Sequence, residues 1–371
     1  MAGLYIHIPF CHSKCVYCDF YSRPCGPKAV AGEASRVVDG LIAEFEARRE
    51  EVSAPFTTVY VGGGTPSVVP AELLGRLFRT LPLGVASEVT LEVNPEDVTP
   101  ETVAAWRDSG VNRVSMGVQA LDDALLRRMG RRHSSRRALE ALDHIYKGGI
   151  TNISADLIYG LPGMTPAEWE DGLKRLLDTP ISHLSAYCLT YHEGTPLYRR
   201  LKEGRVIPAD DEDIELQFNA LRRISAERGF EHYEISNLAK PGFRSAHNSA
   251  YWNPASQWLG IGPSAHSFDG RVRRVDFADT SRWLASLPYP FEIEEEMPLD
   301  LVNDTIVTSL RTLEGLDLRD IPAEHRAALV RAAAPFIASG DMTSGPDGLS
   351  LAINPDRWLI SDRFIRELII D

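Results

Sequence analysis

The chain has little cysteine and lacks long hydrophobic runs. Its 371 residues include five cysteines, and no stretch approaches the roughly 18 consecutive apolar residues that would predict a membrane-spanning helix. The N-terminus also lacks the basic segment followed by an apolar stretch that is typical of a secretory signal. We therefore expect a cytoplasmic protein that is not integral to a membrane, in a compartment where thiols stay reduced.

Positive charge is scarce as well. The 39 lysines and arginines face 52 aspartates and glutamates, which gives a net charge of −13. Nucleic-acid-binding proteins use a basic face to neutralise phosphates, so the composition argues against a nucleic-acid partner. One dense basic run, residues 127–132, ends a predicted helix, where cations complement the exposed carbonyl groups.

Three of the five cysteines are crowded near the N-terminus. Cys11, Cys15 and Cys18 have the spacing Cys-x3-Cys-x2-Cys. An iron–sulfur cube is normally held by four thiolates, so three predict a [4Fe-4S] cluster with one iron open to a small molecule. A zinc site would normally add a second cysteine pair, which the sequence lacks. Cys188 lies in an apolar run and Cys25 in a predicted turn; we expect neither to be a ligand, although spacing alone leaves Cys25 open as a fourth.

Short β-branched segments alternate with amphipathic ones along the first half of the chain. The helical spacing of apolar residues at 37–45 and 70–81 lies between predicted strands. Six strands are predicted, at residues 4–8, 57–61, 88–93, 112–118, 153–159 and 183–189. Strands joined by helical crossovers form a parallel α/β sheet. Periodicity alone allows a partial barrel or a doubly wound sheet.

Residues suited to chemistry follow these strands. In βα-barrels the reactive groups lie at the C-terminal ends of the strands, and the residues predicted there are Cys11, Gly63, Gly64, Thr65, Glu92 and Gln119. Glycines let the backbone approach a ligand closely, although a glycine run after a strand more often forms only a tight turn. Glu92 could instead be a charged residue on a solvated strand edge, without a role in binding. Asp156 lies in an otherwise apolar strand, where its carboxylate requires a ligand or a structural partner.

The cysteine spacing resembles that of the radical S-adenosylmethionine (SAM) superfamily. Motifs spread over most of the chain resemble its oxygen-independent coproporphyrinogen III oxidase-like family. They are YIHIPFC (5–11), VGGGTPS (61–67), EVNP (92–95), RVSMGVQ (113–119), DLIYGLP (156–162) and HNSAYW (247–252). The resemblance implies a partial (β/α)6 barrel with a smaller, mainly helical C-terminal domain.

The resemblance also implies a set of site residues. The three cysteines would hold the [4Fe-4S] cluster, and SAM would bind the open iron through its amino and carboxylate groups. The positions that match SAM contacts of the family are Tyr5, Tyr17, Gly63, Gly64, Thr65, Glu92, Gln119, Arg131 and Asp156. The cofactor would supply the radical chemistry, while the protein orients it and excludes water. Tyr17 could equally be an ordinary loop aromatic.

Two departures narrow the resemblance within this family. The coproporphyrinogen III dehydrogenases carry a fourth cysteine where this chain has Phe20, and a long extension before the cluster, whereas here Cys11 lies near the start. Both features belong to their decarboxylating site, so we do not expect that activity; SAM cleavage stays open. The chain instead resembles the heme chaperone subgroup. The alternatives are a dehydrogenase, a radical SAM methyltransferase and a binding module with a structural cluster.

The 247–252 motif suggests how heme would bind. Histidine is a common axial ligand of heme iron, which makes His247 the first candidate, and Tyr251 and Trp252 would stack on the macrocycle. The family motif usually carries Leu-Arg where this chain has Ser-Ala; Arg244 is the expected substitute for that arginine. His266, in a glycine-rich turn, is a second candidate ligand. The implied partners are heme or a porphyrin, heme-accepting apoproteins and a heme donor.

Three regions are predicted. Residues 1–235 form the radical SAM core barrel, 236–290 an extension with the 247–252 motif, and 291–371 a mainly helical, winged-helix-like C-terminal domain. A Leu-Pro-Tyr-Pro segment and the acidic residues 292–296 predict a linker between the last two regions. Beyond it we expect helices at 300–313, 323–337 and 361–370 and a β-ribbon at 343–353. Nothing in the sequence sets the oligomeric state.

Overall fold

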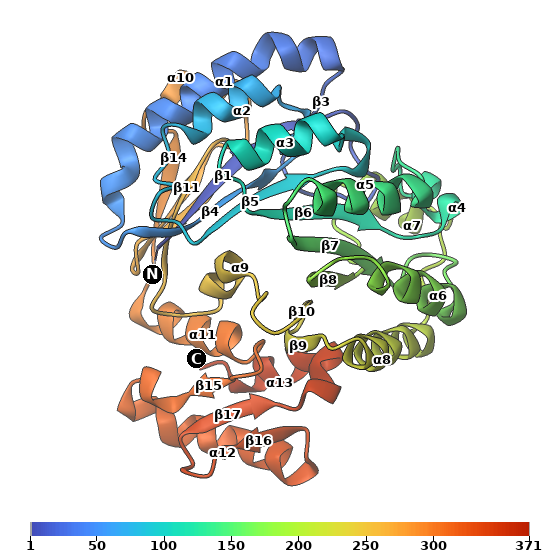
Figure 1. Cartoon of the computed structure of the whole chain (residues 1–371). Coiled ribbons are helices and arrows are strands. Elements are labelled where there is room, and N and C mark those ends of the chain that lie inside the picture. The colour runs from blue at the N-terminus through green and yellow to red at the C-terminus, as the bar shows by residue number, and fades with distance from the viewer. Residues whose placement is uncertain (1, 371) are drawn as a thin grey trace.

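The computed structural model describes residues 2–370 and contains the predicted partial barrel. Six parallel strands lie side by side in chain order and form a curved sheet (Figure 1). They are β1 (Ala2–Ile8), β4 (Phe56–Gly63), β5 (Glu88–Val93), β6 (Arg113–Gln119), β7 (Asn152–Tyr159) and β8 (His183–Cys188). All six predicted strands are therefore confirmed to within about two residues at each end.

The sheet continues beyond these six strands to a total of twelve. At one edge β10 (Asn237–Ala239) pairs with β8, followed by β9 (Glu231–Glu234). At the other edge β11 (Gln257–Ile261) lies parallel to β1, followed by the antiparallel strands β12 (His266–Phe268), β13 (Val272–Asp276) and β14 (Phe291–Glu295). The prediction of a linker at 292–296 is wrong, because most of this segment is strand β14. The acidic residues of β14 are exposed at a sheet edge, where charges prevent pairing with other chains.

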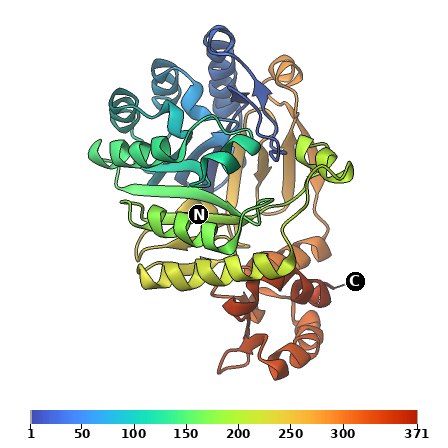
Figure 2. The same cartoon turned by 90° about the vertical axis from the view of Figure 1, so that its right-hand side faces the viewer.

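Helices cover the convex face of the sheet (Figures 1 and 2). They are α1 (Pro27–Arg48), α2 (Ala71–Phe78), α3 (Pro100–Asp108), α5 (Ser135–Lys147), α6 (Pro166–Leu177), α8 (Asp211–Glu227) and α10 (Thr280–Ser286). Strand alternation separates two faces. In β1, Leu4 and Ile6 are fully buried in the core, whereas Tyr5 and His7 point to the opposite, concave face. The same alternation puts polar side chains of the other strands on the concave face.

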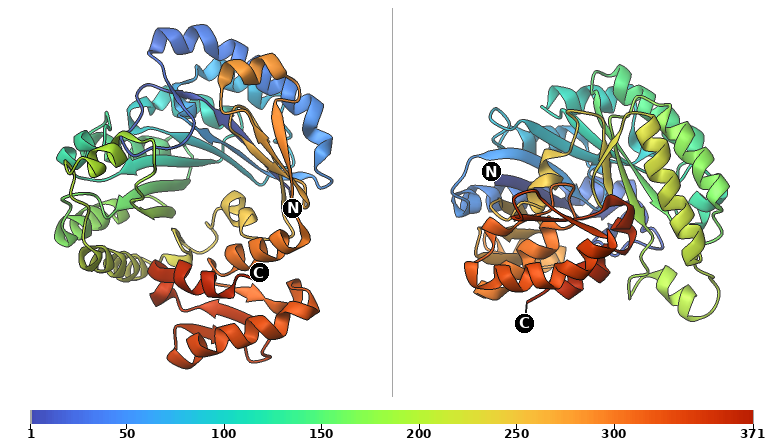
Figure 3. Two further views of the ribbon diagram at one scale, coloured as in Figure 1. Left: turned by 180° about the vertical axis from the view of Figure 1, so that it is seen from behind. Right: turned by 90° about the horizontal axis from the view of Figure 1, so that it is seen from below.

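The C-terminal domain lies across the open side of the arc (Figures 1 and 3). It consists of α11 (Pro298–Ser309), α12 (Ala323–Ser339) and α13 (Ser361–Leu368) with the short strands β15 (Leu316–Asp317), β16 (Met342–Ser344) and β17 (Ser350–Ile353). Backbone hydrogen bonds from Ile235 to Arg311 and from Leu313 to Tyr233 tie it to β9. Over residues 2–370, no helix is both long and apolar enough to cross a bilayer.

Five short elements lie inside the arc or around the cysteine segment. α9 (Ala246–Tyr251) lies inside the arc against β1 and β4, as Figure 3 shows from behind. β2 (Phe10–Cys11), β3 (Arg23–Pro24), α4 (Asp123–Arg128) and α7 (Pro196–Lys202) lie around the cysteine segment.

A buried polar cluster fixes the sheet extension to α1. Arg48 is fully buried and pairs with Glu44 and with Asp276 of β13, while its Nη2 donates to Ser267 of β12. The indole Nε1 of Trp283 donates to Glu44 Oε2 at 2.8 Å. Buried charges are tolerated when they are paired in this way, so the extension holds a defined position beside β1.

Candidate cluster and cofactor site

The cysteine segment is held between two helix ends. It leaves β1 and β2 at one edge of the concave face, and the amide of Val16 donates to the carbonyl of Met129, which follows α4, at 3.1 Å. The amide of Leu197 in α7 donates back to the Val16 carbonyl at 2.8 Å. The thiols of Cys11, Cys15 and Cys18 are free and partly exposed. A segment fixed on both sides can present three thiols to one bound group.

Two of the three thiols have a polar side chain beside them. Cys11 Sγ is 3.2 Å from Thr65 Oγ1, and Arg131 Nη1 donates to Cys15 Sγ at 3.6 Å. Burial raises the pKa of the Cys18 thiol to about 11. Within residues 2–370, no three His, Cys, Asp or Glu side chains are close enough to hold one metal ion. Three thiols on one short segment, with a hydroxyl and a guanidinium beside two of them, match the number of protein ligands expected for a [4Fe-4S] cluster with one open iron.

Glu92 lies at the end of β5, on the concave face. Its Oε1 accepts a hydrogen bond from the Tyr60 hydroxyl at 2.7 Å, and its Oε2 accepts one from the Gly63 amide at 3.2 Å. Burial raises the pKa of this carboxyl to about 7. A Cβ on Gly62 would lie 2.9 Å from the Glu92 carboxyl carbon. The glycine segment therefore lets the carboxylate reach the backbone amide, so its alternative as a solvated edge residue is wrong.

A chain of hydrogen bonds joins the cysteine segment to the ends of β5 and β6. Asn94 Nδ2 donates to Thr65 Oγ1 at 3.2 Å, and Arg131 Nη2 donates to Asn94 Oδ1 at 2.7 Å and to the Gly117 carbonyl at 2.6 Å. Gln119 follows with a φ of +68°, a backbone conformation that is strained for a non-glycine residue. Sequence reasoning did not select Asn94, although it is part of the EVNP motif.

Asp156 has the structural partner that its burial requires. Its Oδ1 accepts a hydrogen bond from the Ser115 hydroxyl at 3.2 Å, and burial raises its pKa to about 6. In β1, the Tyr5 hydroxyl is hydrogen-bonded to His7 Nδ1 at 3.1 Å, and the Tyr5 ring stacks on Tyr60, which donates to Glu92. The strand order thus places Glu92 and Asp156 on one concave face, with Tyr5 beside them.

His247 is enclosed within this site. Its side chain is 2% exposed. Its Nδ1 is hydrogen-bonded to Thr58 Oγ1 at 2.8 Å and its Nε2 to the Tyr251 hydroxyl at 3.0 Å, and burial lowers its pKa to about 3. Both ring nitrogens are therefore occupied. Arg244, the expected propionate partner, instead pairs with Glu231 and Glu314.

A hollow of about 440 Å³ adjoins the cysteine segment. It separates the end of that segment from β11 and β12, and most of its wall is aromatic. The lining residues are Tyr5, His7, Asp19, Phe20, Tyr21, Tyr251, Trp258, Ser264 and His266. Of the residues predicted at the SAM or heme site, it contains Tyr5, Tyr251 and His266, whereas Trp252 does not line it.

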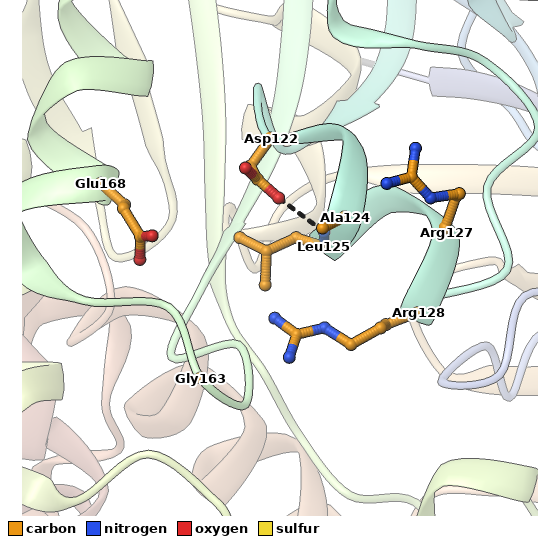
Figure 4. Close-up of a pocket in the computed structure, with 7 residues that line it drawn as sticks. All are labelled: Asp122, Ala124, Leu125, Arg127, Arg128, Gly163 and Glu168. Carbon is orange, nitrogen blue, oxygen red and sulfur yellow. Dashed lines mark hydrogen bonds between the residues drawn. The ribbon is translucent and has the colours of Figure 1, made fainter.

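A separate hollow of about 470 Å³ lies beside α4 (Figure 4). Asp122, Arg127 and Arg128 line it from the α4 side, and Gly163 and Glu168 from the segment that leads into α6. Figure 4 shows Asp122 bonded to the start of α4, where its Oδ1 accepts the Leu125 amide at 2.7 Å. None of the predicted site residues lines this hollow.

Comparison with known proteins gives a consistent result. The family model described as "Radical SAM superfamily" matches residues 5–176. The heme chaperone HemW of Lactococcus lactis is 34% identical over 299 residues, covering 79% of this chain and 76% of that protein. The heme chaperone HemW of Mycobacterium tuberculosis strain H37Rv is 35% identical over 338 residues, covering 87% and 85%.

A solved structure has the same fold. Coproporphyrinogen III oxidase (HemN) from Escherichia coli superposes with a TM-score of 0.84 and covers 99% of this chain and 90% of its own, at 20% sequence identity. At that identity the likeness establishes the architecture, including the mainly helical C-terminal portion.

Proposed function

Since this chain belongs to the HemW-like radical SAM family, we propose that it is a heme chaperone. It binds a [4Fe-4S] cluster, SAM and heme, and it delivers heme to apoproteins. Relatives named as heme chaperones support this assignment. The reducing cytoplasm, where cluster thiols persist, is the proposed location. The acceptors are heme-requiring apoproteins, and a second protein supplies the heme.

The residues of the site have separate tasks in this proposal. Cys11, Cys15 and Cys18 hold the cluster, and Arg131 neutralises the thiolate of Cys15. Together, the cluster and SAM supply one-electron chemistry when bound. Glu92, at the strand end, accepts hydrogen bonds from the amino or hydroxyl groups of SAM.

The remaining predicted SAM residues provide shape and orientation. Gly63 and Gly64 let the ligand approach the backbone, and Thr65 and Gln119 close the same edge. Asp156, Tyr5 and Tyr17 complete the proposed SAM site around the concave face.

The single observation that carries heme as cargo is the aromatic hollow next to the cysteine segment. A flat apolar macrocycle is bound best between aromatic walls, and this hollow offers Tyr251, Trp258 and Phe20, the last of which is 63% exposed. Phe20 stands where the dehydrogenases carry a fourth cysteine. For this reason we favour a chaperone over the runner-up, a coproporphyrinogen III dehydrogenase; a radical SAM methyltransferase is the other alternative.

Anaerobic titration of the cluster-loaded protein with heme tests this function. We expect a saturable Soret band and transfer of the bound heme to an apoprotein such as apomyoglobin. In parallel, the protein is incubated with coproporphyrinogen III, SAM and a reductant. Loss of coproporphyrinogen with release of 5′-deoxyadenosine would contradict the chaperone assignment, and release of S-adenosylhomocysteine with a methylated acceptor would support a methyltransferase.

Iron and sulfide analysis tests the cluster ligands. Reconstituted protein should contain close to four of each per chain, and Cys15→Ala should lose both together. Cys188→Ala is the matched control, because Cys188 lies at the end of β8, outside the cysteine segment. A full cluster in Cys15→Ala would refute the ligand assignment.

A further inference from the structure

The aromatic hollow contains its own candidate for an iron ligand. We propose that heme binds in this hollow with His266 as its axial ligand, while His247 acts behind the wall as a positioning residue. This inference rests on the proposed function and assigns the ligand residue of its cargo. Binding forms one coordinate bond from a neutral imidazole nitrogen of His266 to the heme iron. A water bound to the iron is displaced, and the oxidation state of the iron does not change.

Three histidines lie in or next to the hollow, and their hydrogen bonds differ. His7 is occupied on both ring nitrogens, by the Tyr5 hydroxyl at 3.1 Å and the Tyr21 carbonyl at 2.8 Å. His247 is occupied on both by Thr58 and Tyr251. A nitrogen that coordinates iron needs a free lone pair that faces the ligand, which neither ring offers.

His266 meets both requirements. It is exposed and lines the hollow, and no side-chain hydrogen bond of its ring occurs within residues 2–370. Partial burial lowers its pKa from 6.5, so the ring is neutral at pH 7. A neutral imidazole with a free nitrogen, on a mostly aromatic wall, has the form required of an axial heme ligand.

The backbone fixes His266 at this place. It begins β12 directly after a turn in which Ser264 has a φ of +72°, and Ser264 also lines the hollow. Ser264 and Gln119 are the two non-glycine residues within 2–370 with positive φ. Such strain of roughly 1–3 kcal/mol persists where the surrounding structure enforces it, and it concentrates at binding sites. A Cβ on Gly260 would lie 2.2 Å from the His266 carbonyl oxygen, so the turn is also packed tightly against β11.

His247 supports the aromatic part of the wall that contains Tyr251 and Trp258. Its Nε2 holds the Tyr251 hydroxyl, and its ring stacks on Tyr60 with 5.0 Å between ring centroids. Tyr251 in turn packs edge to face on Trp258 at 5.0 Å. The His247 ring thereby sets the orientation of two aromatic residues that face the cargo. Removing it would loosen the hollow without removing an iron ligand.

The experiment compares heme with iron-free protoporphyrin IX as probes of the full-length, cluster-loaded protein. We expect His266→Ala to weaken heme binding at least tenfold and shift the Soret maximum, with protoporphyrin IX binding unchanged and the Soret position restored by added imidazole. His247→Gln should weaken both probes by a similar factor and leave the Soret maximum of bound heme in place. His325→Ala, in α12 of the C-terminal domain, is the matched control.

The outcomes separate the ligand from the function. Heme binding by His266→Ala with unchanged affinity and spectrum would overturn the ligand assignment while the chaperone function stands. Loss of the heme spectrum in His247→Gln with retained protoporphyrin binding would overturn it in favour of His247. A parent protein without saturable heme binding would overturn the proposed function itself, and the ligand assignment with it.

Discussion

The raised pKa of Glu92 predicts a pH-dependent stability that one substitution removes. The carboxyl titrates near pH 7 in the folded chain and near 4.5 when unperturbed, because it is buried on the concave face. The folded chain therefore keeps this proton to a higher pH than the unfolded chain does. The resulting stabilisation is complete below about pH 4.5 and is lost as the pH rises through 7.

The size of the effect follows from the pKa difference. At roughly 1.4 kcal/mol for each unit of pKa, the difference between 4.5 and 7 corresponds to about 3.5 kcal/mol. Part of Glu92 is accessible to solvent, which screens its charge, so we expect about 1–3 kcal/mol. Glu92→Gln removes the titrating group and keeps an oxygen that can accept from the Gly63 amide. The parent should therefore lose this amount of unfolding free energy between pH 4.5 and pH 8, whereas Glu92→Gln should not.

Urea unfolding of both proteins without SAM, at half-unit steps from pH 5 to pH 8, measures this difference. Glu50→Gln is the control, because Glu50 is 91% exposed. A difference between parent and Glu92→Gln that stays constant within about 0.5 kcal/mol would refute the reasoning, since surface substitutions vary by that much. We also expect SAM to bind more tightly above pH 7 than below it, because an ionised Glu92 accepts stronger hydrogen bonds from the amino or hydroxyl groups of SAM than the neutral carboxyl does.

Three further predictions concern single side chains. Gly64→Ala places a Cβ 2.5 Å from the Phe10 carbonyl oxygen and should lower the free energy of urea unfolding by about 1–3 kcal/mol. Gly84→Ala, with open space around it, should change that free energy by less than about 0.5 kcal/mol. Equal effects of the two substitutions would contradict the packing at Gly64. Arg131→Lys breaks the bonds to the strand ends and should lower iron content after gel filtration, whereas Arg132→Lys, at an exposed position, should retain it. Trp283→Phe leaves a buried carboxylate oxygen without its indole donor and should reduce the urea midpoint by an amount equivalent to about 1–3 kcal/mol; an unchanged midpoint would show that the bond contributes nothing.

Local patterns predicted the barrel because its strands obey a short-range rule. Alternation of apolar and polar side chains along β1 and β5 is a property of neighbouring residues, and so is the helical spacing in α1. The sheet extension lacks this regularity. Its strand β14 carries mostly glutamates, and it forms a strand because β13 offers an edge to pair with. That pairing depends on residues far away in the chain and cannot be read from the segment itself.

The sequence by itself determined which chemical groups the protein carries. Residue type and order alone set three thiols at cluster spacing, a carboxylate at a strand end and histidines near aromatic residues. Only the tertiary structure decided which of these groups are available. His247 and His266 are equivalent as residue types, yet contacts from Thr58 and Tyr251 enclose the first ring, whereas a strained turn leaves the second facing the hollow. The physical reason is that burial and hydrogen bonding are set by segments that meet in space, and the availability of a lone pair depends on both.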